Sequence, residues 1–410
     1  MPLGNSVSRI GGSTVVVVET SDRARPTSVR VAAAFARANL GDVLLCHWHD
    51  LRFLQDVVVA SSGIEYAVKG GIVESVTFRG NVEPSVLFFY APNTGLITAR
   101  DRVFLERFTA TGIDVGGRTA YAVVDRILLE ASRRGLVTNA IGPDRRWGPK
   151  HYQEFKLRRY EAATGRVVPR PNTHVATSLQ VPRLISRFAG RTDLCVIKPA
   201  FGDRGHGIEI VSPDDPPAWT IAEDCVVLQD LLSDPLLIDG HKADLRCYLL
   251  IDVDNVTASG RRGPILVRRA PAVYERGMVT AEVTNTAHRL RRGMPPDILP
   301  LEEAVLIDER LRDAIVSQLE VLLHELTQVY FWDARCLDES TTPQRVPNRV
   351  ILFGVDVLVT ISGSGHPSLY FLEVNPFPGF YRGSIPCDIA IDEMLAREYL
   401  PALLSDQGVE

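Results

Sequence analysis

The sequence lacks the features that would place the protein in a membrane or in a disulfide-bonded compartment. The first ten residues contain no apolar signal-peptide core, and no apolar run approaches the length that spans a bilayer. The six cysteines are widely spaced and form no Cys-x-x-Cys pair, which argues against a disulfide framework and a zinc site. A formal net charge of −5 gives no reason to expect nucleic acid as a partner. We therefore expect a cytoplasmic protein that binds neither membranes nor nucleic acid.

Enough apolar sequence is present to build a large core. Hydrophobic residues make up 45% of the 410 residues and charged residues 23%, which is typical of a globular protein with two or three domains. Strand-like and helix-like runs alternate near the N-terminus and predict a small α/β domain there. The expected elements are strands at 14–18 and 86–90, a helix at 27–40 and a second helix from about residue 98. Glycine and proline accumulate over residues 142–149, so we place the first domain boundary near residue 140.

The remainder of the chain is a mixture of short strands and two helices. We expect helices at 150–163 and 300–329, and strands at 194–198, 208–211, 226–228, 246–253, 265–268, 352–359 and 370–375.

Two apolar strand-like runs near the C-terminus carry oxygen-bearing side chains. Asp356 interrupts the first run, and Glu373 and Asn375 interrupt the second. Because side chains alternate along a strand, Glu373 and Asn375 would share one face while Val374 points to the other. A buried carboxylate is costly unless it is paired or bound to a cation, and Asp, Glu and Asn oxygens suit Mg²⁺. The two runs indicate a Mg-nucleotide site, and two surface strands with polar outer faces are the alternative.

A glycine-rich loop follows the strand that is expected to end at Lys198. Gly202, Gly205 and Gly207 would let backbone amides approach phosphate oxygens, and Lys198 would supply a positive charge. The loop is neither a Walker A motif nor a dinucleotide fingerprint, because the lysine precedes the glycines and a strand follows them. It therefore fits a hairpin flap over phosphates, with an ordinary turn as the alternative.

Charged residues alternate with apolar ones in a third motif. Lys242, Asp244 and Arg246 would lie on one face of a strand, with Leu245 and Cys247 on the other. A solvent-facing strip is the simpler explanation when this motif is taken alone.

Taken in order, the three motifs resemble the ATP-grasp ligases of the tubulin-tyrosine-ligase-like family. That family combines a K-P-x-x-G-x-R-G-x-G-I flap, a Q-x-x-x-x-x-P-L-L hinge, a K-x-D-x-R strand, a threonine–asparagine pair and a D…E-x-N metal site. Over about residues 140–385 this sequence supplies Lys198 to Ile208, Gln229 with Pro235 to Leu237, Lys242/Asp244/Arg246, Thr284-Asn285, and Asp356 with Glu373/Asn375. It departs from the pattern at Asp230, where the family commonly has a basic residue, and at His206 inside the flap.

The resemblance implies a fold of the α/β (α+β ATP-grasp) class. An N-terminal α/β domain at 1–140 would precede a central ATP-grasp subdomain at 141–235, which carries the flap. A C-terminal ATP-grasp subdomain at 236–410 would carry the Mg site, and the last two subdomains would sandwich ATP.

The resemblance also implies roles for individual residues. Asp356, Glu373 and Asn375 would hold Mg²⁺, for which Mn²⁺ could substitute. The catalytic side chains would be Arg246, Arg268 and Lys198, because a planar guanidinium suits the γ-phosphoryl group and an acyl phosphate. Lys156 is an alternative to Lys150 as a phosphate ligand. The nucleotide would be bound by Lys150, Lys198, Arg204, Gly205, Gly207, Gln229, Asp230, Leu232, Lys242, Asp244, Thr284 and Asn285.

The implied activity is that of an ATP-dependent carboxylate–amine ligase. A substrate carboxylate would attack the γ-phosphate of ATP, and an amine would displace phosphate from the resulting acyl phosphate. The expected partners are ATP, a carboxylate on a peptide, protein or small acid, and an amino-acid or other amine co-substrate. The alternative is an ATP-grasp kinase that phosphorylates a polyanionic small molecule, for which the arginine-rich run between Arg261 and Arg292 would be suited.

Overall fold

A computed structural model of the chain describes most of the predicted elements. The described residues are 14–19, 25–37, 42–47, 50–53, 58–60, 63–69, 72–79, 81–90, 131, 136–138, 147–185, 193–200, 207–214, 225–253, 257–284, 297–304, 307–338, 349–376, 378, 380 and 385–405. The predicted helix from about residue 98 lies outside these residues, as do Arg204, Gly205, His206 and Asn285.

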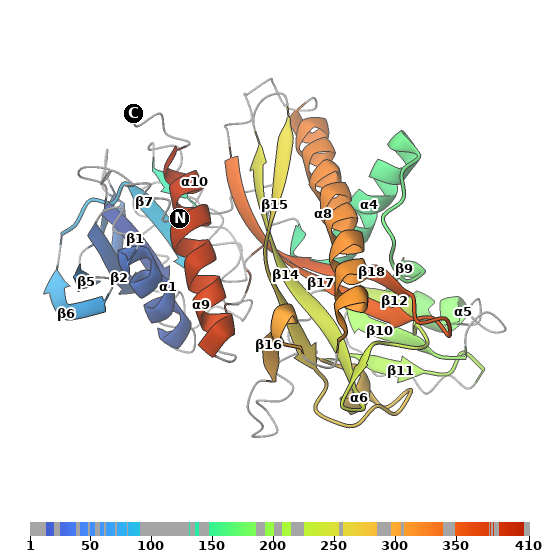
Figure 1. Cartoon of the computed structure of the whole chain (residues 1–410). Helices are drawn as coiled ribbons and strands as arrows, with labels where there is room; N and C mark the ends of the chain where they lie inside the picture. The colour runs from blue at the N-terminus through green and yellow to red at the C-terminus, as the bar shows by residue number, and fades with distance from the viewer. Residues whose placement is uncertain are drawn as a thin grey trace.

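The N-terminal part forms a six-stranded sheet with the order β6-β5-β2-β1-β7-β8. The central strand β1 pairs in parallel with β2 and β7, and α1 follows β1 (Figure 1). Residues Val15 to Val18 of β1 are fully buried, which fits a β-branched run covered on both faces. The elements are β1 (Thr14–Glu19), α1 (Arg25–Arg37), β2 (Asp42–His47), β5 (Gly63–Lys69), β6 (Ile72–Arg79), β7 (Val86–Tyr90) and β8 (Val137–Thr138), with a separate pair β3 (Leu51–Phe53) and β4 (Val58–Ala60).

A smaller, four-stranded sheet with the order β11-β10-β12-β9 follows, and its pairings are all antiparallel. Helix α4 precedes it and ends at Gly165, which adopts a left-handed conformation with φ of 71°. The elements are α4 (Lys150–Thr164), β9 (Thr173–Ala176), η3 (Ser178–Gln180), α5 (Val181–Ile185), β10 (Cys195–Pro199), β11 (Glu209–Val211) and β12 (Val226–Asp230).

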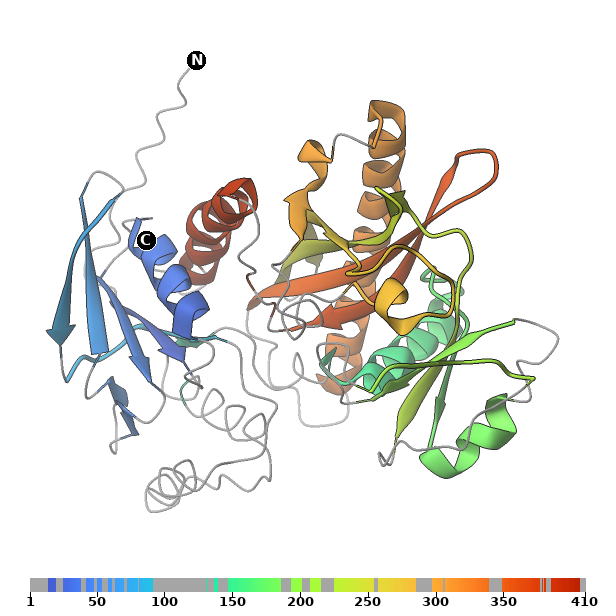
Figure 2. The ribbon, with the colours of Figure 1, turned by 90° about the horizontal axis from the view of Figure 1, so that it is seen from below.

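The third sheet is built from long antiparallel strands in the order β16-β15-β14-β17-β18, with β13 paired to β14. One face of it packs against α8, which lies beside α4 in both views (Figures 1 and 2). The elements are β13 (Leu237–Ile238), β14 (His241–Val253), β15 (Ala258–Arg269), α6 (Val279–Glu282), β16 (Ile298–Pro300), η4 (Leu301–Glu303), α8 (Glu309–Asp338), β17 (Arg349–Ile361) and β18 (Pro367–Asn375).

The helix predicted at 300–329 is misplaced at both ends. Pro300 closes β16, and the chain makes a 3₁₀ turn before α8 begins at Glu309 and continues to Asp338. Proline lacks the backbone N–H that a helix interior needs, and the apolar face of α8 extends its contact with the sheet beyond the predicted end.

The last helices return to the N-terminal part of the molecule. Helix α9 (Ile385–Met394), the π-helical turn η5 (Leu395–Tyr399) and α10 (Leu400–Ser405) lie between α1 and the third sheet (Figures 1 and 2). Their apolar side chains share one buried cluster with those of α1, β1 and β7. Tyr248 and Leu250, on the outer face of β14 that is turned away from α8, belong to the same cluster. Within the described residues, no helix combines the length and the apolar character that crossing a bilayer requires.

Candidate active site

A cleft of about 980 Å³ that opens to solvent lies where the second and third sheets meet. Aliphatic side chains border it from both sides, Val196 and Ile210 from the small sheet and Leu358 and Leu372 from the large one. Such a slot suits a planar ring. The structure brings eleven predicted site residues to this lining: Lys150, Lys198, Gln229, Asp230, Leu232, Lys242, Asp244, Arg268, Thr284, Asp356 and Glu373.

Two neighbouring strands of the small sheet place a lysine and a glutamine side by side in the cleft. Lys198 near the end of β10 donates from Nζ to Oε1 of Gln229 on β12, over 2.6 Å. Burial lowers the pKa of Lys198 to about 8, against the opposing attraction of Glu373. Gly207, on the far side of the flap, has φ of +67°, and a Cβ there would lie 2.7 Å from the ring of Pro199. The flap therefore needs glycine at this position.

The two candidate phosphate lysines of α4 lie in different places. Lys150, the first residue of the helix, lines the cleft with Nζ 3.4 Å from Glu373. Lys156 is buried against α8, where Nζ lies 2.7 Å from Asp333 and 4.7 Å from the centre of the Trp147 ring. Only Lys150 of the two is therefore placed to meet a nucleotide.

The charged strip of β14 has the predicted alternation. Lys242, Asp244 and Arg246 lie on the face toward the cleft, and all three are buried. Leu245 and Cys247 belong to the apolar core on the opposite face. The simple alternative of a solvent-facing strip is excluded by this burial.

Neighbouring side chains form ion pairs and hydrogen bonds with the residues of this strip. Lys242 Nζ lies 2.5 Å from Glu282, which follows on α6. Arg268 on β15 donates from Nε and Nη2 to the two oxygens of Asp244, both over 2.8 Å. The hydroxyl of Thr284 also donates to Asp244. The carboxylate of Asp244 therefore holds the side chains of Arg268 and Thr284 in place at the edge of the cleft.

Asp356 on β17 and Glu373 on β18 are direct cross-strand partners. A bulge follows this pair and leaves Leu372 as an extra residue in β18. Asp356 accepts hydrogen bonds from Nε and Nη2 of Arg246, the latter over 2.9 Å, and Arg268 Nη2 lies 3.0 Å away. Two carboxylates opposite each other destabilise a sheet unless cations lie beside them, and here arginines and Lys150 do so.

The two carboxyl groups differ in their titration. Burial opposes the ionisation of Glu373, but the charges of Lys150 and Lys198 lower its pKa to about 2. Burial, partly offset by Arg246 and Arg268, raises the pKa of Asp356. Glu373 is consequently ionised at every physiological pH.

The predicted metal ligands form an oxygen-only set. Asn375 lies two residues beyond Glu373 on β18, opposite Gly354, outside the cleft lining itself. Among the described residues, no group of three His, Cys, Asp or Glu side chains is placed to hold a metal ion, so the amide would have to complete this set. Two carboxylates and an amide fit Mg²⁺, which takes its other ligands from water and phosphate.

Arg246 lies beneath the cleft rather than in its lining. Its side chain is 2% exposed and is engaged with Asp356. A Cβ at Gly354 on β17 would lie 2.7 Å from Arg246 Nη1, so the glycine makes room for the guanidinium. Arg246 thus sets the position of a carboxylate from below, whereas Arg268 borders the open cleft.

Asp230 borders the cleft, but its carboxylate belongs to the other face of β12. Strand alternation places it on the side of Leu228 and of its cross-strand partner Cys195, opposite to Gln229. Burial and the charge of Asp230 raise the pKa of the Cys195 thiol to about 11.

Most described arginines of the arginine-rich run lie in surface ion pairs. Arg269 contacts Asp239 and Asp297. Arg276 contacts Asp193 over 2.5 Å. In the part of the run that the structure describes, Arg268 alone borders the cleft, and Arg289, Arg291 and Arg292 lie outside the described residues.

Two residues of the site region were not predicted from the sequence. Glu282 enters the cleft beside Lys242, although nothing in the spacing of residues on α6 marks it. Gln153 on α4 uses its amide to bond both backbone groups of Val374, over 2.8 and 2.9 Å. It thereby fastens α4, and with it Lys150, to the strand that carries Glu373. A helical glutamine carries no local signal of such a role.

Comparisons with known proteins find a family that resembles part of the chain and a solved structure with a similar fold. A model of the tubulin-tyrosine ligase family matches residues 157–258, which include the flap, the hinge and the charged strip of β14. Among solved structures, the C-terminal domain of K. lactis Pby1, described as an ATP-grasp enzyme that interacts with the mRNA decapping enzyme Dcp2, has a TM-score of 0.53 at 13% identity. That match covers 96% of this chain and 94% of the other. Residues 157–258 are thus similar to the tubulin-tyrosine ligase family, and the chain has an ATP-grasp fold.

Two curated proteins resemble this chain over a short stretch. Tubulin polyglutamylase TTLL7 of Mus musculus and that of Homo sapiens are each 36% identical to it over 56 residues. The stretch is 14% of this chain and 6% of either polyglutamylase.

Proposed function

We propose that the protein is an ATP-dependent carboxylate–amine ligase that forms an amide bond through an acyl phosphate, adding an amino acid to a peptide, protein or small acid. One observation carries the proposal: cationic side chains from both sheets and from α4 line the same cleft as the paired carboxylates Asp356 and Glu373. Cations in this arrangement suit a polyphosphate, and the carboxylates suit the divalent cation that accompanies it. The family match and the ATP-grasp fold support the same reading.

The nucleotide would lie between the two sheets. The aliphatic slot would hold the adenine ring, with Gln229 and the backbone at Asp230 and Leu232 along its edge. Lys198 and Lys150 would contact the α- and β-phosphates. The remaining nucleotide contacts would come from Lys242, Asp244, Thr284 and Asn285, and from the flap residues Arg204, Gly205 and Gly207.

The γ-phosphoryl end would lie near Arg268 and the two carboxylates. Asp356, Glu373 and Asn375 would hold Mg²⁺ or Mn²⁺, which when bound neutralises phosphate charge. Arg268 would donate hydrogen bonds to the γ-phosphoryl oxygens and to the acyl phosphate, and Arg246 would keep Asp356 in place from below.

The reaction balances without a nucleophile from the protein. An oxygen of the substrate carboxylate bonds to the γ-phosphorus while the bond to the β–γ bridging oxygen breaks, and ADP leaves. The amine nitrogen then bonds to the acyl carbon, phosphate departs, and the nitrogen loses a proton. The contribution of the protein is positioning and charge neutralisation.

A phosphate-release screen of amino acids and peptides, with products weighed by mass spectrometry, tests the proposal. A ligase releases orthophosphate and yields a product equal in mass to acid plus amine minus water. A kinase consumes ATP without orthophosphate and yields a phosphorylated product. Normal MgATP binding without ATP consumption for any acid–amine mixture would contradict ligase activity.

A further inference from the structure

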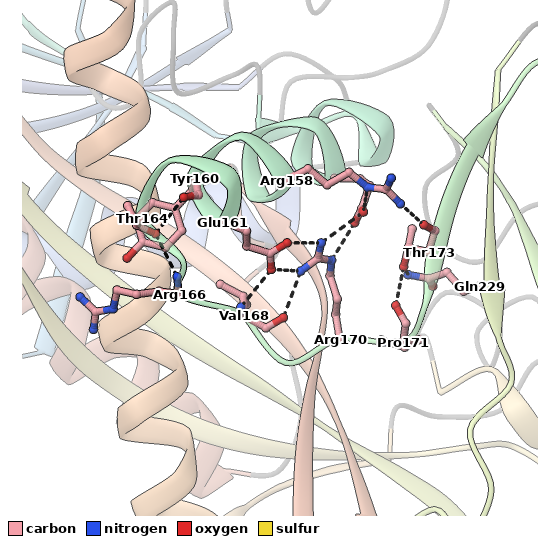
Figure 3. A network of polar contacts seen from close by, with 11 residues as sticks. Arg158, Tyr160, Glu161, Thr164, Arg166, Val168, Arg170, Pro171, Thr173 and Gln229 are labelled. Atoms are coloured by element: carbon pink, nitrogen blue, oxygen red, sulfur yellow. Dashed lines mark hydrogen bonds and ion pairs between the residues drawn. The ribbon is translucent and has the colours of Figure 1, made fainter.

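Hydrogen bonds lead from α4 through Thr173 to Gln229 (Figure 3), and Gln229 in turn bonds the cleft lysine Lys198. Arg158 of α4 donates to the backbone carbonyl of Thr173, the first residue of β9. The hydroxyl of Thr173 donates to the carbonyl of Pro171 over 2.7 Å and accepts from Gln229 Nε2 over 3.0 Å. Gln229 Oε1 then accepts from Lys198 Nζ over 2.6 Å.

The path has one consistent direction. A threonine hydroxyl has a single proton, and here it is given to Pro171, so the oxygen can only accept from Gln229. The donor end of the Gln229 amide must therefore face Thr173, and its carbonyl end faces Lys198. Thr173 is 4% exposed and Gln229 is 6% exposed, so water does not compete freely for these groups.

Thr173 is itself held firmly. Arg158 Nε lies 2.5 Å from the buried Glu154 of the same helix. Glu154 also accepts a hydrogen bond from Arg170 over 2.8 Å, and Arg170 bonds Glu161 over 2.9 Å (Figure 3). This network fastens the segment that leads into β9 onto α4, and so fixes the place from which the hydroxyl acts.

We propose that Thr173 is a positioning residue of the nucleotide site, whose hydroxyl fixes the Gln229 amide with its carbonyl oxygen toward Lys198 and so aims the lysine ammonium into the cleft. The inference rests on the proposed function in naming phosphate as the group that the ammonium meets. The orientation of the amide rests on the hydrogen bonds alone.

Removing the hydroxyl has a defined electrostatic consequence. Without it the Gln229 amide can turn and present its NH₂ group to the Lys198 ammonium, which places two donors against each other. The charged form of the lysine loses its acceptor, so its pKa, already low because of burial, falls further. A purely structural role for Thr173 predicts no such change at Lys198.

The test observes Lys198 directly. The chain has five lysines, so a protein labelled with ¹³Cε- and ¹⁵Nζ-lysine gives a simple spectrum in which Lys198→Arg identifies the missing signal. Thr173→Val should lower the titration midpoint of Lys198 by about one unit, and Thr173→Ser, which keeps the hydroxyl, should restore it. Thr164→Val removes another threonine hydroxyl of the same helix and linker network and should leave the midpoint unchanged. An unchanged midpoint in Thr173→Val overturns the proposal.

Nucleotide binding separates this inference from the proposed function. Thr173→Val should weaken MgADP binding about tenfold, while Thr173→Ser binds as the unmodified protein does. If the unmodified protein binds no nucleotide but Thr173→Val still shifts Lys198, the proposed function fails and the positioning of the ammonium stands.

A second pair of variants covers the case in which Thr173→Val does not fold. Thr173→Ala carries the same prediction, and in a Gln229→Met background it should cause no further shift of Lys198, because the intermediate group is already gone. An added shift in that background overturns the relay.

Discussion

Lysine is rare in this chain, and most of its lysines face the same cleft. Of 45 basic residues only five are lysines, and Lys150, Lys198 and Lys242 border the cleft. A lysine ammonium is a compact charge that can lose its proton when it is buried, whereas arginine stays charged. Lys198, with its lowered pKa, is thus a cleft residue whose positive charge depends on pH.

Lys198 should take up a proton when MgATP binds. Its pKa of about 8 in the free protein means that it is charged at neutral pH and loses its charge as the pH rises through that value. Phosphate favours the charged form, so binding at pH 8 should take up about half a proton. Calorimetry in buffers of different ionisation enthalpy measures this number.

Two further measurements of proton uptake test the assignment to Lys198, one at lower pH and one in a variant. Uptake should be close to zero at pH 6.5, where the lysine is already charged. It should vanish in Lys198→Arg, because a guanidinium does not titrate in this range. Equal uptake at both pH values would refute the assignment of the titrating group.

Glu373→Gln should abolish turnover while leaving the fold intact. The substitution removes an ionised oxygen ligand, so we expect a loss of about 100-fold or more in turnover and a matching loss of Mn²⁺ binding measured by electron paramagnetic resonance. The low pKa of Glu373 means that its attraction to Lys150 and Lys198 outweighs its repulsion of Asp356, so the variant should melt at a somewhat lower temperature while remaining folded.

A matched control for this variant is Glu320→Gln. Glu320 is exposed and lies 3.6 Å from Arg262, far from the charged strip in sequence, and its substitution should leave turnover and metal binding unchanged. Near-normal turnover of Glu373→Gln would remove Glu373 from the metal site.

At the scale of the element, α4 joins the two sheets that form the cleft. Gln153 fastens it to β18, and Arg158 with Arg170 fastens it to the segment that leads into β9. The side chains of its two lysines consequently lie in different places: Lys150 contacts Glu373 in the cleft, and Lys156 contacts Asp333 of α8.

Exchanging each of these lysines for methionine should separate binding from stability. Lys156→Met leaves Asp333 as an uncompensated buried charge and should lower the free energy of unfolding by about 3 to 5 kcal/mol, measured by urea denaturation. Lys150→Met should weaken MgATP binding about tenfold with a small effect on stability.

The double variant Lys156→Met with Asp333→Leu removes both buried charges. It should regain most of the lost stability, because well-packed apolar residues replace the ion pair. If Lys156→Met instead weakens MgATP binding and leaves stability unchanged, the assignment of Lys156 to stability rather than to nucleotide binding is wrong.

The alternation of side chains along a strand explains how much of the site can be predicted from the sequence. A period of two placed Lys242, Asp244 and Arg246 on one face, and the structure confirms it because β14 is regular at these residues. The bulge at Leu372 and the clamp by Gln153 could not be predicted, since they depend on which strand and helix meet in three dimensions. The same holds for Thr173, whose role arises only when β9 pairs with β12.

At the scale of the whole molecule, the C-terminal helices pack against the N-terminal part of the chain. Residues 385–405 lie beside α1, although they follow the strands of the third sheet. Hydrophobic periodicity indicates that such a segment is helical, but it does not say which distant surface the helix covers. The predicted domain boundaries remain a prediction, and any division of the chain has to account for this returning segment.

Leu395 tests whether the returning helices join the first sheet to the rest of the molecule. It is fully buried in the cluster that contains α1, β1 and the outer face of β14, so Leu395→Ala should lower the free energy of unfolding by about 2 to 5 kcal/mol. Because the cluster spans both parts, calorimetry should show a single transition that moves to lower temperature. Leu179→Ala, at a side chain that is 91% exposed, should leave the transition in place. Two resolved transitions, of which Leu395→Ala moves only one, would show that the first sheet unfolds independently of the ATP-grasp cleft.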